Sequence, residues 1–447
     1  MNNLSELAAA LAAGTVTAAA LVERSLAAIA DTRGEGGVAF TRVYANEAHV
    51  AAVAIDRMRA AGRAPSRYAG IPFSVKDLFE IAGDPTPAGS LALADAPPTR
   101  RTAPAIGRLM AMGMIPIGRT NMTEFAFSGL GLNPHYGTPR NPWDRATGRI
   151  PGGSTSGGAV SVADGMVAAA IGTDTGGSCR IPAALCGVVG YKPTARRVPL
   201  DGAFPLSTSL DSVGPLANTV ACCAILDAFM AGEPPVPPSP MSLSGLRIAL
   251  PANLVLDDMD NAVARAYADA LALLEAAGAK LIEIALPALD EIAAVQAKGG
   301  LNVPEAYATH RDLLAAKGDM YDPRVRQRIE RGAGIPAADY IDALRARGKI
   351  AARMNVLTQD YDVLAMPTCP VIPPVLAELQ SDDAAYARAN LLMLRNPSLT
   401  NFLDRCAISI PCHREGDAPV GLMLMGETMG DAKLFRIAEA VEAELQG

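Results

Sequence analysis

The sequence has few residues of the kinds that bind metals or form large aromatic clusters. Its 447 residues include four histidines and one tryptophan, and aromatic side chains make up 4% of the chain. The histidines (His49, His135, His310 and His413) do not form the HExxH pattern of many zinc hydrolases. We therefore expect no metal and no cofactor, and a core built mainly from aliphatic side chains.

Long uncharged apolar runs are also missing. No stretch of about 18 apolar residues occurs, so we expect no membrane-spanning segment. The first 24 residues contain Glu6 and no basic cluster, which does not fit a secretory signal. The net charge of −7 is spread along the chain, which argues against nucleic-acid binding. These absences predict a cytoplasmic protein without a membrane or nucleic-acid partner.

One basic group lies between positions 322 and 331. Arg324, Arg326, Arg328 and Arg331 alternate there with Asp322 and Glu330. Mixed charges at this spacing are typical of a solvated helix face, and we favour that interpretation over an anion site.

The seven cysteines show no CxxC pair and no zinc-ligand spacing with a histidine. Their number is odd, and most lie in apolar or glycine-rich surroundings. We expect buried, reduced thiols at each of them. The positions are Cys179, Cys186, Cys222, Cys223, Cys369, Cys406 and Cys412.

What the chain does contain is an alternation of helical and strand patterns, which is typical of an α/β fold. Apolar residues make up 50% of the sequence, enough for a large core. We expect helices near 4–11, 22–29, 106–112, 261–277 and 434–445. We expect strands near 71–75, 114–117, 168–171, 280–286, 363–366, 407–410 and 420–425. The segment 232–240 is rich in proline and predicts an extended connector.

Two glycine-rich turns, residues 152–158 and 172–178, carry several serines. Neither matches the GxSxG elbow of a Ser-His-Asp hydrolase, and neither has the lysine of a phosphate-binding P-loop. The remaining possibility for these turns is a nucleophilic serine that is activated by a lysine base. Lys76 follows the apolar strand near 71–75, where desolvation can keep an amine neutral.

Together these segments resemble the amidase signature family. The resemblance is carried by Val75-Lys76-Asp77, by residues 152–157 and by the long motif 172–182. It extends through residues 121–125, 141–144 and 187–193 to 419–422 and so covers nearly the whole chain. It implies an α/β/α sandwich in which one large mixed central sheet is flanked by helical layers. A single domain, residues 1–447, would comprise N-terminal helices (about 1–31), a signature core (about 66–220), the connector 232–240 and a C-terminal part (241–447) that completes the sheet.

The resemblance also implies roles for individual residues. Ser178 is the expected nucleophile, Lys76 the base, and Ser154 the bridging serine on a cis peptide. The backbone N–H groups of Thr175, Gly176, Gly177 and Ser178 would form the oxyanion hole. Asp174 and Arg180 would belong to the frame of the site. Thr155 and Cys179 depart from the usual family residues, which leaves the roles of these two positions open.

Residues 122–136 are the expected wall of the substrate pocket. Their apolar side chains predict either an apolar or aryl acyl group in the substrate, or core packing, and both interpretations stay open. The candidate substrate contacts are Phe125, Phe127, Ser128, Tyr136 and Thr155.

The predicted function is an amidohydrolase that cleaves a small linear carboxamide to a carboxylate and ammonia or an amine through a Ser178 acyl-enzyme. The first alternative is the A subunit of a glutamine-dependent tRNA amidotransferase, which Thr123 disfavours because such subunits usually carry Asp there. The second is a non-catalytic anion- or nucleotide-binding α/β protein. The exact amide, any cleavage of esters, ureas or carbamates, and the oligomeric state, with a homodimer as the candidate, stay open.

Overall fold

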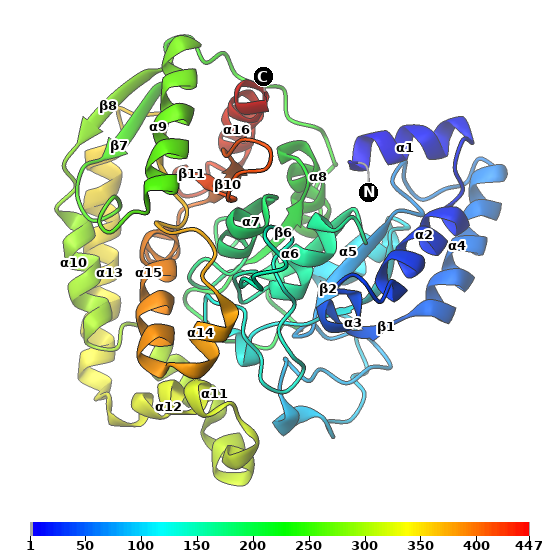
Figure 1. The fold of residues 1–447 in the computed structure, drawn as a ribbon, viewed down its shortest axis with the longest axis horizontal. Coiled ribbons are helices and arrows are strands. Elements are labelled where there is room, and N and C mark those ends of the chain that lie inside the picture. Colours follow the sequence, from blue (N-terminus) through cyan, green and yellow to red (C-terminus); the bar gives the residue numbers. More distant parts are fainter. Residues whose placement is uncertain (1–2, 447) are drawn as a thin grey trace.

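The computed structural model describes residues 3–446 and contains one sheet of eleven strands (Figure 1). The strand order is β1-β3-β2-β4-β6-β5-β10-β11-β9-β7-β8. The strands are β1 (Phe40–Val43), β2 (Pro72–Lys76), β3 (Ile115–Thr120), β4 (Ala169–Thr173), β5 (Val189–Lys192), β6 (Val213–Ala217), β7 (Arg247–Pro251), β8 (Lys280–Ile284), β9 (Val363–Pro367), β10 (Ala407–Pro411) and β11 (Gly421–Met425).

The sheet is mixed. Strands β3, β2 and β4 run parallel to one another, as do β8, β7 and β9, whereas the strands between these two groups pair antiparallel. Most central strands are buried along their whole length because helices cover both faces. This burial explains why they read as nearly continuous runs of apolar or small residues.

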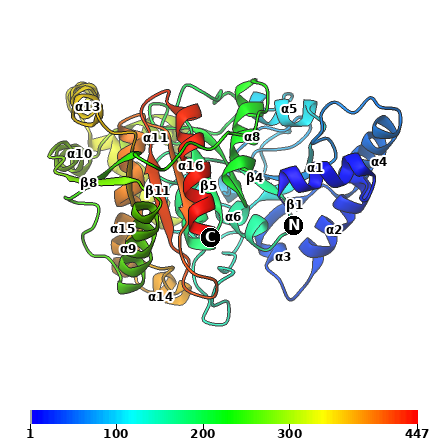
Figure 2. The same ribbon diagram turned by 90° about the horizontal axis from the view of Figure 1, so that it is seen from above.

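One helical layer packs on one face of the sheet, with α8 between α5 and α16 (Figure 2). Leu7, Ile225 and Ile437 from this layer share a core with Phe73 and Val75 of β2. The layer consists of α1 (Leu4–Ala13), α5 (Pro104–Ala111), α8 (Val220–Ala231), α9 (Asn261–Ala276) and α16 (Asp431–Gln446).

The opposite face is covered by a second layer, in which neighbouring helices contact one another from α2 through α7 to α13. It consists of α2 (Ala18–Ala30), α3 (Gly36–Ala39), α4 (Ala45–Ala60), α6 (Ser156–Ala163), α7 (Arg180–Cys186), α10 (Ala288–Ala297), α13 (Ala337–Thr358) and α15 (Asp383–Phe402). The expected α/β/α arrangement is therefore confirmed.

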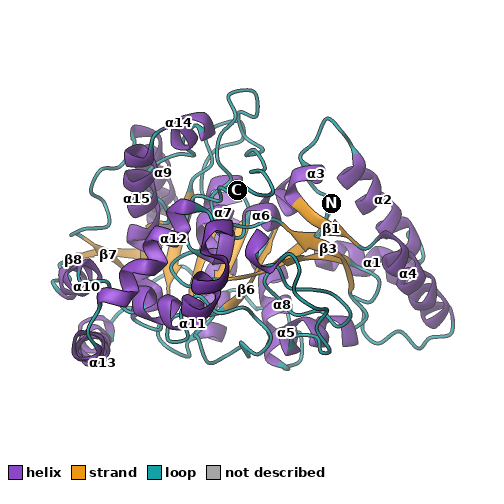
Figure 3. Ribbon diagram, turned by 90° about the horizontal axis from the view of Figure 1, so that it is seen from below, coloured by secondary structure: helices purple, strands orange, loops and turns teal. Residues whose placement is uncertain are grey.

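Further helices lie at the end of the molecule that faces the viewer in Figure 3, where α11 and α12 are in front. They are α11 (Asn302–Lys317), α12 (Pro323–Glu330) and α14 (Leu376–Ser381), with short 3-10 helices at Leu91–Leu93, Glu124–Ala126, Gly318–Met320 and Arg331–Gly334. Among residues 3–446, no helix is long and apolar enough to cross a membrane.

The proline-rich segment 232–240 runs along the surface without a helix or strand of its own. Strands β1 to β6 precede it and β7 to β11 follow it, yet β5 pairs with β10 in one continuous sheet. We therefore propose that residues 1–447 form a single domain.

The expected elements are present, with small differences at their ends. Thr17 caps α2 by accepting a hydrogen bond from the Ala20 N–H, as its position predicts. The strand expected near 114–117 continues to Thr120 because it pairs with β2 as far as Lys76. The strand expected near 280–286 ends at Ile284.

Candidate active site

Lys76 and Thr173 lie at the carboxyl ends of two neighbouring parallel strands, β2 and β4. Such ends meet at one edge of a sheet, where α/β proteins commonly place functional side chains. Lys76 Nζ donates to Ser154 Oγ at 2.7 Å and to Thr173 Oγ1 at 3.0 Å. The lysine and Ser154 are fully buried. The structure thus joins the predicted base to the predicted bridging serine.

Burial lowers the pKa of Lys76 to about 8, and the negative charge of nearby acidic groups, including Asp174 and Asp211, limits the shift. At pH 7 about one lysine in ten is then neutral, against about one in two thousand for a solvated lysine. A largely neutral amine is therefore expected only above pH 8.

Asp77 follows the lysine but does not pair with it. Its Oδ1 accepts a hydrogen bond from Arg119 Nε at 2.7 Å, and its Oδ2 accepts one from the Gly89 N–H at 3.3 Å. Because Arg119 engages this carboxylate, the carboxylate does not hold the Lys76 ammonium as an ion pair. The amine keeps hydroxyl groups as its nearest side-chain partners.

The first glycine turn places Ser154 against Lys76. The Gly153–Ser154 peptide is cis, as the resemblance implies. The Gly153 N–H donates to Gly129 O at 2.9 Å, and a Cβ on Gly153 would lie 2.5 Å from Gly131 N, so only glycine fits there. The Thr155 N–H donates to Ser178 O at 3.3 Å and thereby ties this turn to the second one.

Asp174 organises the second turn, which carries Ser178. Its carboxylate accepts hydrogen bonds from the N–H groups of Gly177 and Cys179 and from both Nε and Nη2 of Arg180, at 2.8–3.1 Å. Burial alone would raise the pKa of Asp174, but the Arg180 guanidinium outweighs it and holds that pKa at about 2. Asp174 and Arg180 therefore frame the turn, as the sequence predicts.

The oxyanion hole expected from the sequence needs one correction. The Gly177 N–H donates to Asp174 Oδ1 at 2.8 Å, so this amide is not free to bind an oxyanion. No acceptor among residues 3–446 is bonded to the amides of Thr175, Gly176 and Ser178. Gly177 has φ +124°, and a Cβ there would lie 2.5 Å from Pro397 Cβ, so the glycine is needed for shape and not for its amide.

Helix α15, from the C-terminal half of the chain, packs over this turn. Asn401 Nδ2 donates to both the carbonyl oxygen and the Oδ1 of Asp174 at 2.9 Å. Leu394 and Ser398 carry the atoms nearest to the place a Gly176 side chain would take. Both halves of the sequence therefore build the turn that holds Ser178.

The five candidate substrate contacts are spread over different environments. Phe125 is 1% exposed, and its ring packs on those of Phe204, His310 and Tyr321, as expected of a core residue. Ser128 Oγ donates to Asn390 Oδ1 at 2.8 Å. Tyr136 is half-buried, and Phe127 lies under the Arg328 guanidinium. Thr155 is fully buried against Gly158 and Gly172, which suits packing better than contact with substrate.

The interpretation of the arginine group on α12 is wrong for one member. Arg324 pairs with Asp383, and Arg326 pairs with Asp319 and Glu330, but Arg328 is half-buried and donates from Nη1 to Phe127 O. The buried residues Val325 and Ile329 on the same helix give a signal for this orientation, because positions three and four residues apart share a face.

The expectation of burial holds for every cysteine except Cys412, which is half-buried. All seven are free, and six of them are buried. Cys179, next to Ser178, donates from Sγ to Gly214 O in β6 at 3.5 Å. Within the described part of the chain, no cluster of three or more His, Cys, Asp or Glu residues could hold a metal ion.

Known proteins share both this sequence and this fold. A family model described as Amidase matches residues 20–435. A 2-amino-5-chloromuconic acid deaminase of Comamonas testosteroni is 38% identical over 89% of this chain and 86% of that protein. The A subunit of a glutamyl-tRNA(Gln) amidotransferase of Chloroflexus aggregans is 35% identical over 97% and 94% of the two chains. A crystal structure of an amidase superposes with a TM-score of 0.89 at 31% identity over 99% of each chain.

The lysine–serine arrangement on this fold and these similarities define a hydrolase that acts on carbon–nitrogen bonds of amides. The chain belongs to the amidase family. The alternative of a non-catalytic anion-binding protein is therefore set aside.

Proposed function

We propose that the chain hydrolyses a small linear carboxamide through an acyl-enzyme on Ser178, with Ser154 as proton relay and Lys76 as base. Ser178 Oγ forms a bond to the amide carbon while its proton passes through Ser154 to the neutral Lys76 amine. The C–N bond then breaks, and the same proton returns to the leaving nitrogen. Water releases the acid in a second cycle. The 2.7 Å contact between Lys76 Nζ and Ser154 Oγ is the observation that carries this proposal.

The amides of Thr175, Gly176 and Ser178 are proposed to stabilise the oxyanion of the tetrahedral intermediate. They lie in one turn whose geometry Asp174 fixes through four hydrogen bonds from within the turn and Arg180. Fixed amides stabilise developing charge without having to reorganise, which is commonly a large part of catalysis.

The substrate is proposed to carry a carboxylate on its acyl side. Arg328 forms no ion pair with Asp or Glu in the described chain, although its neighbours Arg324 and Arg326 do. Its guanidinium lies 4.5 Å from the centre of the Phe127 ring. Two residues further on, Gly129 accepts a hydrogen bond from the turn that carries Ser154. A half-buried guanidinium that lies near Asp322 but forms no salt bridge within residues 3–446 suits an anionic substrate group.

The name of the Comamonas relative points the same way, since it denotes an amino-substituted acid as substrate. This name also supports a second candidate function, the hydrolytic removal of the amino group of such an acid. The two candidates differ in product: an amidase turns the amide into a second carboxylate, whereas a deaminase leaves the existing carboxylates unchanged. Mass spectrometry of the products separates them.

The nucleophile is tested with Ser178→Ala. We expect a folded protein without measurable turnover, and labelling of the parent alone by a serine-directed fluorophosphonate. Ser154→Ala should acylate slowly at Ser178, because the relay is cut but the oxyanion hole is intact. Substantial turnover by Ser178→Ala, or a label on Ser154 in the parent, would contradict the assignment.

Carboxylate recognition is tested by comparing Arg328→Met with Arg324→Met, a matched change on the same helix. The Arg328 variant should lose roughly 10- to 100-fold in kcat/KM on amides whose acyl group bears a carboxylate, and much less on neutral amides. Equal losses on both substrate classes, or equal effects of the two variants, would remove Arg328 from the site.

Action as a free-standing enzyme is tested with the purified chain. We expect it to hydrolyse amides on its own, with no second protein present, and to keep its rate after exhaustive chelation. Activity only in the presence of a partner would favour the amidotransferase alternative, and loss of activity restored by zinc would overturn the serine–lysine mechanism.

A further inference from the structure

Asp211 is a buried carboxylate that contacts the second glycine turn, residues 172–178, from outside it. We call this turn, which carries the proposed oxyanion-hole amides, the oxyanion turn. Its Oδ1 accepts a hydrogen bond from Thr175 Oγ1 at 2.5 Å. Its Oδ2 accepts the N–H groups of Leu206 and Ser207 at 3.0 and 3.1 Å. One oxygen is thus anchored in its own loop, and the other is presented to Thr175.

The backbone around Thr175 is held at two points. Before it, Asp174 exchanges hydrogen bonds with Ser212, from the Asp174 N–H to Ser212 O at 2.8 Å and from the Ser212 N–H to Asp174 O at 3.1 Å. After it, the Gly177 N–H is bound by Asp174 Oδ1. Thr175 and Gly176 lie between these points. Because Gly176 has no side chain, the Thr175 hydroxyl is the one side-chain anchor of this stretch.

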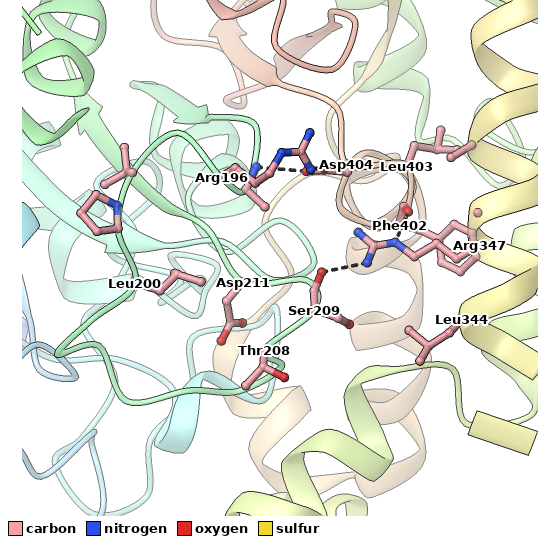
Figure 4. Close-up of a pocket in the computed structure, with 15 residues that line it drawn as sticks. Arg196, Leu200, Thr208, Ser209, Asp211, Leu344, Arg347, Phe402, Leu403 and Asp404 are labelled. Carbon is pink, nitrogen blue, oxygen red and sulfur yellow. Dashed lines mark hydrogen bonds and ion pairs between the residues drawn. The ribbon is translucent and has the colours of Figure 1, made fainter. Parts of the chain in front are cut away.

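The far side of Asp211 faces a pocket of about 710 Å³. Figure 4 shows Asp211 and Thr208 on one wall, opposite Leu344 and Arg347 of α13. Asp211 is 6% exposed, and on this side the hydrogen bonds from Thr175, Leu206 and Ser207 fix the orientation of the carboxylate.

We propose that Asp211 is a positioning residue for the oxyanion hole. Through the Thr175 hydroxyl it fixes the peptide between Thr175 and Gly176, so that the free amides point at the oxygen of the tetrahedral intermediate on Ser178. This inference rests on the Ser178 acyl-enzyme of the proposed function. Because it concerns the transition state, the link affects kcat and the binding of tetrahedral adducts more than it affects KM.

The test replaces the hydroxyl of Thr175. Thr175→Val keeps the shape and removes the donor, whereas Thr175→Ser keeps the donor. We expect Thr175→Val to lower kcat roughly 10- to 100-fold with KM within about threefold of the parent, and Thr175→Ser to stay within about threefold in both. The affinity for an aldehyde that adds to Ser178 should fall with kcat. Thr208→Val, in the same pocket wall, is the control and should match the parent.

A double-mutant cycle shows whether Asp211 acts through Thr175. Asp211→Ala removes the acceptor of the Thr175 hydroxyl, so it should lower kcat to the same extent as Thr175→Val and should add little in the Thr175→Val background. Losses that simply multiply, or a valine variant within threefold of the parent in kcat, would overturn the proposal. If Thr175→Val does not fold, Thr175→Ala is judged by the same criteria.

The outcome is separable from that of the proposed function. A parent enzyme that fluorophosphonate does not label on Ser178 refutes the acyl-enzyme itself. A labelled parent whose kcat does not depend on the Thr175 hydroxyl refutes the role of Asp211 alone.

Discussion

Lys76 at the end of β2 and Lys192 at the end of β5 occupy two similar regions of one sheet. Both side chains are fully buried, and burial lowers the pKa of each to about 8. Their partners differ. Lys76 Nζ contacts the hydroxyls of Ser154 and Thr173 at 2.7 and 3.0 Å and, at 3.5 Å, the Thr173 carbonyl oxygen, whereas Lys192 Nζ donates to the carbonyl oxygens of Pro193 and Arg405 at 2.7 and 2.9 Å.

This difference fits the proposed base at Lys76 and a structural cation at Lys192. A hydroxyl can donate as well as accept, so a neutral Lys76 can receive the Ser154 proton in its lone pair. A carbonyl only accepts, so Lys192 meets no donor that its lone pair could use among these contacts. A lowered pKa is common to both regions and therefore does not identify the catalytic lysine. The partners do.

The most direct test of the difference between Lys76 and Lys192 is the effect of each lysine on catalysis. Lys76→Met should lower kcat by about 10³-fold or more, because the base is lost, and Lys76→Arg should not restore it, since guanidinium keeps its proton. Lys192→Met should stay within about tenfold of the parent per folded molecule. Rates are normalised to the folded fraction from circular dichroism. Near-parental activity of Lys76→Met would show that lysine is not the base.

A second prediction concerns stability against pH. Burial lowers each folded-state pKa from 10.5 to about 8, so each buried ammonium lowers the free energy of unfolding below pH 8. The decrease in the free energy of unfolding is about 3 kcal/mol per lysine below pH 8, and it disappears as pH rises to 10.5. Urea unfolding of the parent and of each methionine variant between pH 7 and 10.5 should show this change in the difference between the two proteins, because all other titrating groups are common to both. A difference that does not change with pH would mean that the pKa of the replaced lysine is not lowered.

A third prediction compares the two variants at one pH. Lys192→Met leaves two buried carbonyls without their donors, whereas the hydroxyls freed by Lys76→Met can rotate toward other partners. The free energy of unfolding should be lower for Lys192→Met than for Lys76→Met by about 2 kcal/mol. Equal stabilities at pH 7 would show that the carbonyl contacts contribute nothing.

The smallest effect is on the pH dependence of the rate. If neutral Lys76 is the active form, kcat/KM rises about fivefold from pH 7 to 8 and levels near pH 9. Lys192→Met should leave this curve in place, because Lys192 has no part in the proton path. A shifted pH–rate curve for Lys192→Met would contradict this prediction, because it would show that Lys192 affects the titration of Lys76.

Much of the fold and of the candidate site was predictable from the sequence, because both depend on local patterns and motifs. The strand ending at Lys76 and the two glycine turns follow from apolar runs and glycine placement. The occupied Gly177 amide also had a local signal, since Asp side chains often bind backbone N–H groups a few residues on, and Asp174 lies three residues before it.

Contacts between distant segments were not predictable. Thr173, Asp211, Arg328 and Asn401 meet the site only after folding. The hydrogen bond from Asn401 to Asp174 spans 227 residues, and the contact from Arg328 to Phe127 spans 201. The sequence around Asn401 and around Arg328 does not indicate which residue each of them contacts. Arg328 looked solvated because its charge pattern resembles that of its helix neighbours, and only the buried Val325 and Ile329 indicate its orientation.

The contact of α15 with the second glycine turn has a consequence for the protein during its synthesis. Lys76, Ser154 and Ser178 leave the ribosome in the first half of translation. Asn401, which holds Asp174, and Pro397, which packs on Gly177, follow more than 200 residues later. A nascent chain that has not reached α15 contains every residue of the proposed triad but lacks the contacts that support the second glycine turn. On the proposed mechanism, we expect activity to begin only when the chain is nearly complete, and we expect removal of α15 to abolish it although Lys76, Ser154 and Ser178 are all present.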